Sequence, residues 1–174
     1  MYKRQKPDNI ILKYKNTPLA KNVVKIVDFG LSSFVEVDEY LYKRCGTPGF
    51  VAPEVINADK KDPNLRFSPK CDVFSVGIIF YFMLTGNIPY DGETFQDVLT
   101  NNKNATIDWS DPCLKKVTPE ALDLMKHMLE LNVSKRYSAS ECLLHPYFNS
   151  IHECAFSSSS LNLNTNVNEL KDKY

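Results

Sequence analysis

The stretch from Cys71 to Leu84 reads CDVFSVGIIFYFML, and it determines the predicted architecture more than any other part of the chain. Its apolar side chains fall on all sides of a helix, and a helix that is apolar all round is normally buried at the centre of a domain. Ser68 is a suitable N-cap ahead of it, and residues 85–87, which include a glycine, end it. The run is shorter than the roughly 20 residues that a membrane span needs. We therefore predict a central, buried helix in a mainly α-helical fold.

Shorter helices are expected on the C-terminal side of this stretch. One covers residues 93–101. A second starts at the Thr118–Pro119 pair, where a threonine cap is followed by proline at the first helical position. Ser138 and Glu141 have the spacing of a capping box and begin a last helix that runs to residue 144. These elements predict a helical bundle.

A β-hairpin is expected at the N-terminal end. Ile10–Leu12 is a short apolar run that is typical of a buried strand, and Val23–Val27 is rich in β-branched residues. Residues 15–18 between them carry turn chemistry, so the loop of the hairpin is enlarged. The second strand ends at Asp28. From residue 30 to residue 53 no period is sustained, which indicates a long functional loop.

Bulk composition excludes several classes of protein. The 174 residues suffice for one domain with a core, and the formal net charge is zero, which argues against a nucleic-acid partner. The five cysteines are odd in number and form no Cys-x-x-Cys pair, so we predict free thiols in a reducing compartment rather than a zinc site. No apolar signal segment opens the chain. We expect an intracellular, cytoplasmic protein without a membrane partner.

Three phrases occur in a specific order along the chain. They are Lys6–Asn9 (KPDN), Lys25–Gly30 (KIVDFG) and Gly46–Glu54 (GTPGFVAPE). Together they resemble the catalytic loop, the metal-binding loop and the activation segment of a eukaryotic protein kinase. Lys70–Gly77 (KCDVFSVG) and Ser138–Glu141 (SASE) are similar to the calcium/calmodulin-dependent and calcium-dependent kinase group.

The resemblance covers Lys6–Phe148 and implies a fold and a domain plan. We expect residues 1–148 to form part of a protein kinase domain, an α+β C-lobe with a short hairpin at its N-terminal end and no N-lobe. Residues 149–174 are rich in Ser and Asn and are expected to be a flexible tail. Because the helices that precede the catalytic loop in the family are absent, part of the central helix should be exposed, and the isolated chain should aggregate or be marginally stable.

The resemblance also implies a phosphoryl-transfer site. Asn9 and Asp28 match the residues that hold two magnesium ions and ATP, and magnesium prefers such oxygen ligands. Lys6 matches a lysine that approaches the γ-phosphate in serine/threonine kinases, where a flexible cation steadies the transferred charge. Thr47 matches a threonine beside the path of the substrate hydroxyl. The implied substrate is a Ser or Thr hydroxyl of a protein, and a regulatory protein or segment is a possible second partner.

Arg4 departs from the family pattern. It occupies the position of the catalytic Asp, and an arginine cannot accept a proton at neutral pH. Losing general-base assistance costs roughly 10²–10⁴ in rate. Met1–Gln5 resembles nothing in the family, so we expect a truncated chain with little activity alone and an active kinase as the intact parent. A pseudokinase-like binding module, in which Arg4 is genuine, is the alternative.

Three further residues are expected to support the fold. By resemblance, Glu54 pairs with Arg136, and the helix residue Asp72 hydrogen-bonds the catalytic-loop backbone. Removing one partner of a buried pair costs about 3–5 kcal/mol, so the pair matters for stability more than for chemistry.

Overall fold

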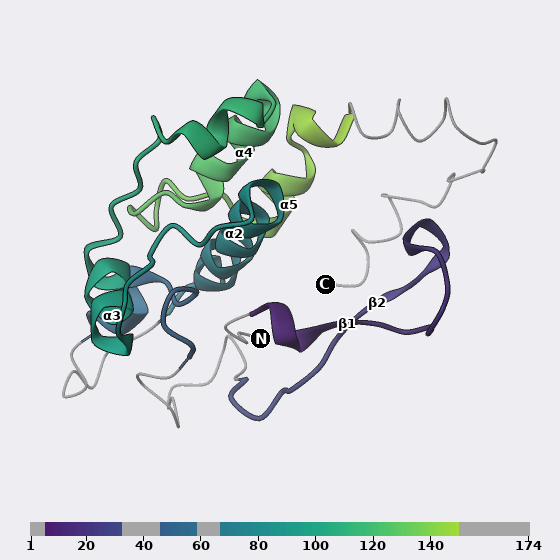
Figure 1. The fold of residues 1–174 in the computed structure, drawn as a ribbon, viewed down its shortest axis with the longest axis horizontal. Coiled ribbons are helices and arrows are strands. Elements are labelled where there is room, and N and C mark those ends of the chain that lie inside the picture. The colour runs from purple at the N-terminus through teal and green to yellow at the C-terminus, as the bar shows by residue number, and fades with distance from the viewer. Residues whose placement is uncertain (1–5, 33–45, 59–66, 150–174) are drawn as a thin grey trace.

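The computed structural model describes residues 6–32, 46–58 and 67–149 (Figure 1). Its described part is rich in helix and contains one two-stranded antiparallel sheet, as the sequence predicts. The elements, in chain order, are η1 (Pro7–Asn9), β1 (Ile10–Leu12), η2 (Leu19–Lys21), β2 (Val24–Ile26), α1 (Pro53–Ile56), α2 (Lys70–Thr85), α3 (Phe95–Asn104), η3 (Pro112–Lys116), α4 (Pro119–Met128) and α5 (Ala139–Leu143).

Helix α2 lies at the centre of the bundle, and it packs against α4 and η3. Phe74 and Ile78 on α2 are fully buried, as is Met125 on α4. Gly77 allows the close approach, because a Cβ at this position would lie 2.8 Å from Leu129 Cδ2. The predicted central helix is therefore confirmed.

The two ends of α2 follow from local chemistry. The prediction that Ser68 is the N-cap was wrong, because α2 starts at Lys70 and Pro69 is its N-cap. Ser68 Oγ still accepts a hydrogen bond from the Lys70 N–H at 3.3 Å. Gly86 has φ of 77°, a left-handed conformation that glycine adopts without a steric penalty, and its N–H donates to the Phe82 carbonyl. The last turns of α2 are partly exposed, which agrees with the expectation that part of the central helix is left uncovered. Phe82 is 41% exposed and Met83 is 75% exposed.

The other helices are bounded by their caps. Thr118 accepts from the Ala121 N–H and starts α4, and Ser138 with Glu141 forms the capping box of α5, both as predicted. Helix α3 begins two residues later than predicted and extends to Asn104. The reason is a capping box between Thr94 and Asp97, which sets the first turn at Phe95.

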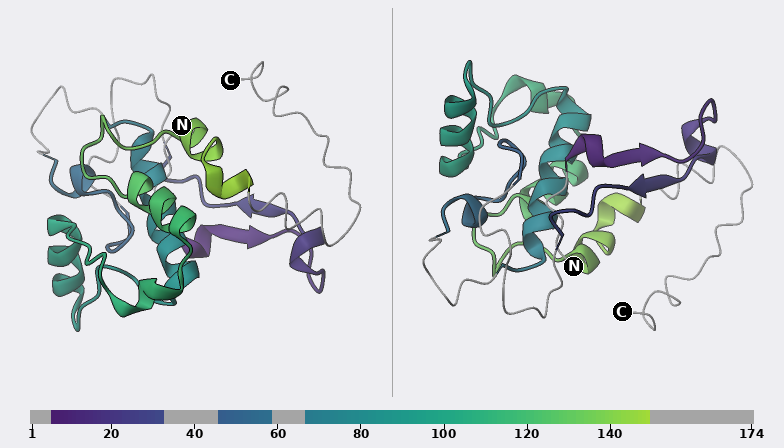
Figure 2. Two further views of the ribbon diagram at one scale, coloured as in Figure 1. Left: turned by 90° about the horizontal axis from the view of Figure 1, so that it is seen from above. Right: turned by 90° about the horizontal axis from the view of Figure 1, so that it is seen from below.

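The β1–β2 hairpin projects from the helices, and both views of Figure 2 show this. Its register pairs Ile10 with Ile26 and Leu12 with Val24. The prediction that the first strand is buried was wrong, since Ile11 is 45% exposed and Leu12 is 48% exposed. An apolar run indicates a strand, but burial also requires another element to cover it, and no described helix packs over this ribbon.

Several expectations fall outside the described residues. These are Arg4, the middle of the long loop at 33–45 and the tail from residue 150. No helix in the described part of the chain is long and apolar enough to cross a membrane.

Candidate functional site

The hairpin brings two of the predicted site segments together. The Val27 N–H donates a hydrogen bond of 2.9 Å to the Asn9 carbonyl, which extends the strand pairing by one step beyond Ile10 and Ile26. Asp28 follows Val27 directly and is therefore held beside η1. Residues almost 20 positions apart in sequence thus meet at one end of a ribbon.

Asn9 is the buried member of this pair, with 7% of its surface exposed. Its backbone N–H donates to the Lys6 carbonyl at 3.0 Å, which fixes the turn of η1. Among the described residues, no group hydrogen-bonds its side-chain amide. A buried polar group without a partner is uncommon and requires an explanation, such as an ion or ligand that it binds.

Asp28 is exposed and has φ of 65°, a left-handed conformation that Asp tolerates better than most residues. An ideal Cβ placed on Gly30 would lie 3.6 Å from Asp28 Oδ1, so the carboxylate lies over this glycine. The site therefore offers one carboxylate and one amide oxygen. Such a donor set fits magnesium, which takes one or two protein oxygens and completes its shell with phosphate oxygens and water.

Lys6 lies on the other side of Asn9. Its Nζ is 3.5 Å from Asp8 Oδ2, and the two side chains are 32% and 83% exposed. A surface ion pair of this kind contributes at most about 1 kcal/mol, so it holds the ammonium group only weakly. The lysine remains available to an anionic ligand.

Thr47 is exposed and lies in a different segment, at the start of residues 46–58. Its carbonyl accepts from the Phe50 N–H at 3.2 Å, which closes a tight turn. In the described part of the chain, no hydrogen bond joins Thr47 to Lys6, Asn9 or Asp28. The structure thus groups three predicted site residues and leaves the fourth on a separate loop.

The pair between Glu54 and Arg136 is formed as predicted. Arg136 donates from both terminal nitrogens to the two carboxylate oxygens of Glu54, at 2.7 and 3.0 Å. The guanidinium is fully buried and lies 4.9 Å from the centre of the Phe74 ring. Tyr90 stacks on the same ring, and burial raises the pKa of its hydroxyl against the opposing effect of the Arg136 charge. This pair joins α1 to the turn after α4 through the centre of the core.

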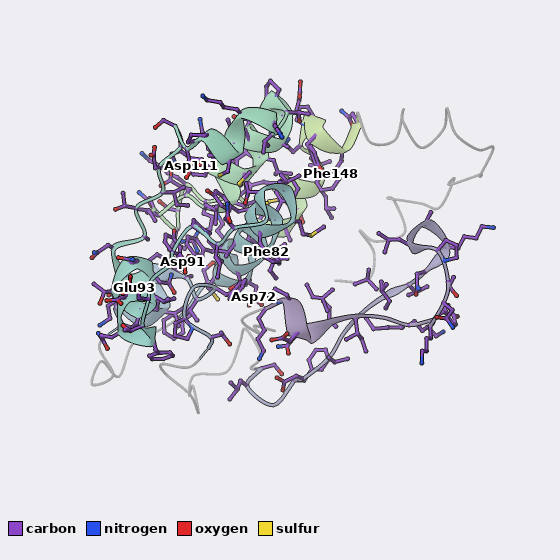
Figure 3. All side chains as sticks on the ribbon, in the orientation of Figure 1. Asp72, Phe82, Asp91, Glu93, Asp111 and Phe148 are labelled. Carbon is purple, nitrogen blue, oxygen red and sulfur yellow. The ribbon has the colours of Figure 1, made fainter. Side chains whose placement is uncertain are left out.

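Asp72 lies in the first turn of α2 and is half-buried. Figure 3 shows it near η1, on the catalytic-loop side of the helix. Its expected hydrogen bond to the backbone of that loop stays a prediction.

Sequence reasoning missed Asn102. This residue is fully buried and hydrogen-bonds the backbone of residues 49 and 51. The available signal was weak, since Asn102 is one of two adjacent asparagines and lies just beyond the predicted end of this helix at residue 101.

The hairpin thus holds the segment of Asn9 beside the segment of Asp28, next to the helical bundle. The family model described as "Protein kinase domain" matches residues 1–148. The chain belongs to the eukaryotic protein kinase family, in its serine/threonine branch, and the resemblance seen in the sequence is confirmed.

Individual relatives agree with this assignment. The chain is similar to calcium-dependent protein kinase 3 of Plasmodium yoelii yoelii, with 34% identity over 82% of this chain and 25% of the relative. It is similar to myosin light chain kinase 2, skeletal/cardiac muscle, of Mus musculus, with 36% identity over 86% of this chain and 23% of the relative. It is also 32% identical to the probable serine/threonine-protein kinase fhkC of Dictyostelium discoideum, over 85% of this chain and 24% of the relative. The chain spans about a quarter of the length of these curated relatives.

Proposed function

We propose that this chain is the C-lobe part of a kinase that transfers the γ-phosphoryl group of ATP to Ser or Thr hydroxyls of proteins. Residues 1–148 belong to the kinase domain and residues 149–174 form a tail. The observation that carries the proposal is the hydrogen bond from the Val27 N–H to the Asn9 carbonyl, in a chain of the kinase family. It holds Asp28 beside Asn9, whose buried side-chain amide has no hydrogen-bond partner among the described residues.

Each site residue has a distinct role in this proposal. Asn9 and Asp28 would hold magnesium, which would supply positive charge that neutralises the phosphates of ATP. Lys6 places its ammonium group beside the transferred phosphoryl group, where a positive charge stabilises the transition state. Thr47 lies beside the acceptor hydroxyl and favours Ser and Thr. Glu54, Arg136 and Asp72 keep the surrounding backbone in place.

Arg4 affects the rate. A cationic side chain at this position cannot accept the proton of the acceptor hydroxyl, and general-base catalysis contributes roughly 10²–10⁴ in rate. We therefore propose that this chain alone has little activity. The partners that fit the proposal are a protein substrate and a regulatory protein or segment. The names of the calcium-dependent relatives suggest that calcium controls the regulator, and a cytoplasmic location fits the free thiols.

Phosphate transfer to peptides tests this function. The full-length product of the gene is incubated with magnesium, labelled ATP and Ser, Thr or Tyr peptide libraries. We expect transfer to Ser and Thr peptides, and a loss of roughly 10²-fold or more in Asp28→Asn, because this variant removes the charge that holds the metal.

Asp91→Asn is the matched control. Asp91 is an exposed aspartate on another loop, and its Oδ1 accepts from the Gly92 N–H, a contact that an asparagine oxygen can keep. Equal transfer by the wild type and Asp28→Asn, or no transfer to Ser and Thr peptides, would contradict the proposal. Either result would favour a pseudokinase-like binding module instead.

A further inference from the structure

We infer that Asn102 is a positioning residue for the peptide substrate. It fixes the loop of residues 46–52, which carries Thr47, against helix α3. This inference rests on the proposed kinase function and adds to it a residue outside the three motif phrases. No charge or metal is involved, and Asn102 acts only through the backbone of the loop.

The contacts of Asn102 bracket one residue of this loop. Its Oδ1 accepts a hydrogen bond of 2.9 Å from the Gly49 N–H, and its Nδ2 donates one of 2.9 Å to the Val51 carbonyl. The Asn102 side chain is fully buried, so water does not compete for either bond. A single amide therefore fixes the backbone on both sides of Phe50, much as a neighbouring strand would.

The loop depends on such an outside partner. Residues 46–52 form no helix or strand, so no regular ladder satisfies their backbone groups. Gly49 has φ of 89°, and a tight turn from Thr47 to Phe50 is closed by one hydrogen bond. Thr47 lies two residues before the bond to Gly49. A shift at Gly49 is therefore passed directly to the side chain of Thr47.

Helix α3 is a rigid support for Asn102. Its start is fixed by the reciprocal hydrogen bonds of Thr94 and Asp97. Its end is held by the buried Tyr90 hydroxyl, which donates to the Ala105 carbonyl at 3.4 Å. Figure 3 shows Asp91 and Glu93 at the near end of this helix, where the chain enters it. A site on a rigid helix can hold a loop within the small tolerance that catalysis requires.

The location of the contact predicts which kinetic constant it controls. Asn102 hydrogen-bonds the loop that carries Thr47, and among the described residues it forms no hydrogen bond with the hairpin that carries Asn9 and Asp28. Loss of its hydrogen bonds should therefore weaken binding of the peptide and leave binding of ATP unchanged. A residue that only stabilises the core would change neither KM in the fraction of protein that stays folded.

Two variants of the full-length product test this inference. Asn102→Asp keeps an oxygen for the Gly49 N–H but removes the donor to Val51. Gly49→Ala leaves Asn102 intact and strains the loop, because alanine disfavours a positive φ. We expect each to raise the KM for a Ser peptide roughly tenfold, as loss of a buried hydrogen bond does, with the KM for ATP unchanged.

Asn101→Ala is the matched control. Asn101 is the exposed neighbour on α3, and its Nδ2 donates to the Asp91 carbonyl instead of to the loop. We expect this variant to keep the peptide KM of the wild type. Hydrogen exchange of the Gly49 amide, measured in each variant, reports whether the bond to residue 102 is present.

The possible results separate this inference from the proposed function. An unchanged peptide KM in folded Asn102→Asp, or an equal rise in both KM values, would overturn the inference alone. If Asn102→Asp does not fold, an unchanged peptide KM in Gly49→Ala overturns it. If the wild type and Asp28→Asn both transfer no phosphate, the proposed function is overturned, and the inference falls with it.

Discussion

Arg136 carries a fully buried charge that its neighbours must compensate. Besides its two bonds to Glu54, its Nε donates to the Glu130 carbonyl at 2.8 Å and Nη1 donates to the Lys70 carbonyl at 3.0 Å. The guanidinium is completely buried, so each of these acceptors replaces water. A charge in this setting is tolerated only because the opposite charge and the carbonyl dipoles compensate its desolvation.

Replacing Arg136 with alanine should therefore destabilise the fold strongly. We expect Arg136→Ala to lose about 3–5 kcal/mol of unfolding free energy, because Glu54 is left without its buried partner. Urea denaturation followed by circular dichroism measures the loss. Lys135→Ala, at the exposed neighbouring position, should leave the midpoint unchanged. An unaltered midpoint in Arg136→Ala would contradict the role of the pair.

The roles of some of these residues could be predicted from the sequence, and the roles of others could not. Glu54, like Asn9 and Asp28, lies in a phrase that can be recognised by its order and spacing. The family resemblance assigns Arg136 as the partner of Glu54, so their pairing could be anticipated. Asn102 could not be, because its partners are backbone groups about 50 positions away and backbone groups carry no sequence signal. The separation of Thr47 from the hairpin likewise depends on how the elements pack.

At the scale of the elements, the sequence predicts the start of a helix correctly where the capping residue is clear. Thr118 and Ser138 mark the starts of α4 and α5, and β-branched residues mark the two strands. Helix α3 starts later than predicted, because the capping box of Thr94 and Asp97 sets its first turn. Burial of the hairpin could not be predicted, since it depends on what packs over the ribbon rather than on the ribbon itself.

Helix α2 can approach the end of α4 closely because residue 77 is a glycine, which has no side chain. We expect Gly77→Val to cost about 1–3 kcal/mol of stability, because added methyl groups would overlap Leu129 and Met128 and force the helices apart. Chemical denaturation measures this loss. Val76→Ala, at the exposed neighbouring position, is the control and should have a much smaller effect. Wild-type stability in Gly77→Val would show that Leu129 can move aside.

The capping box of α5 predicts how the stability of the protein depends on pH. Hydrogen bonds from the Ser138 N–H and hydroxyl lower the pKa of the exposed Glu141 carboxyl. An unfolded Glu titrates near about 4.3, so the stabilisation is complete above that pH and is lost as pH falls through the lower folded value.

An NMR titration of the Glu141 carboxyl carbon should therefore show a midpoint below about 4.3. Ser138→Ala should move this midpoint upward, because the hydroxyl is lost while the backbone N–H remains. Glu141→Gln should have the same stability as the wild type at low pH and a lower one at neutral pH. A midpoint unaffected by Ser138→Ala would contradict the predicted contribution of the side chain.

At the scale of the whole molecule, exposed apolar side chains form several groups on the described surface. Among the described residues, one is the hairpin, where Ile11, Val24 and Ile26 are each more than 40% exposed, and another is the last turns of α2 around Met83. The end of α5 adds Leu143 and Leu144, which are 65% and 75% exposed. Large exposed apolar surfaces favour association. Such surfaces are consistent with the expectation, from the sequence, that the isolated chain aggregates.

We predict that the isolated chain self-associates through these surfaces. Light scattering across a concentration series should show a mass that rises with concentration. Met83→Lys should reduce this rise, since Met83 is 75% exposed and its replacement removes no buried contact. Thr100→Lys adds the same charge at an exposed site on α3 and is the control. A constant monomeric mass for the wild type would contradict the prediction.

The ion pair at the centre of the core also constrains the timing of folding during synthesis. Glu54 and Arg136 are 82 residues apart in sequence. A ribosome adding about 5–20 residues per second needs roughly 4–16 s to synthesise that interval. Throughout that time α1 lacks the cation that joins it to the rest of the bundle, and α2 lacks it from the completion of Thr85 onward. The nascent chain thus holds its most apolar helix uncovered for seconds, a period in which a chaperone can bind it before Arg136 completes the core.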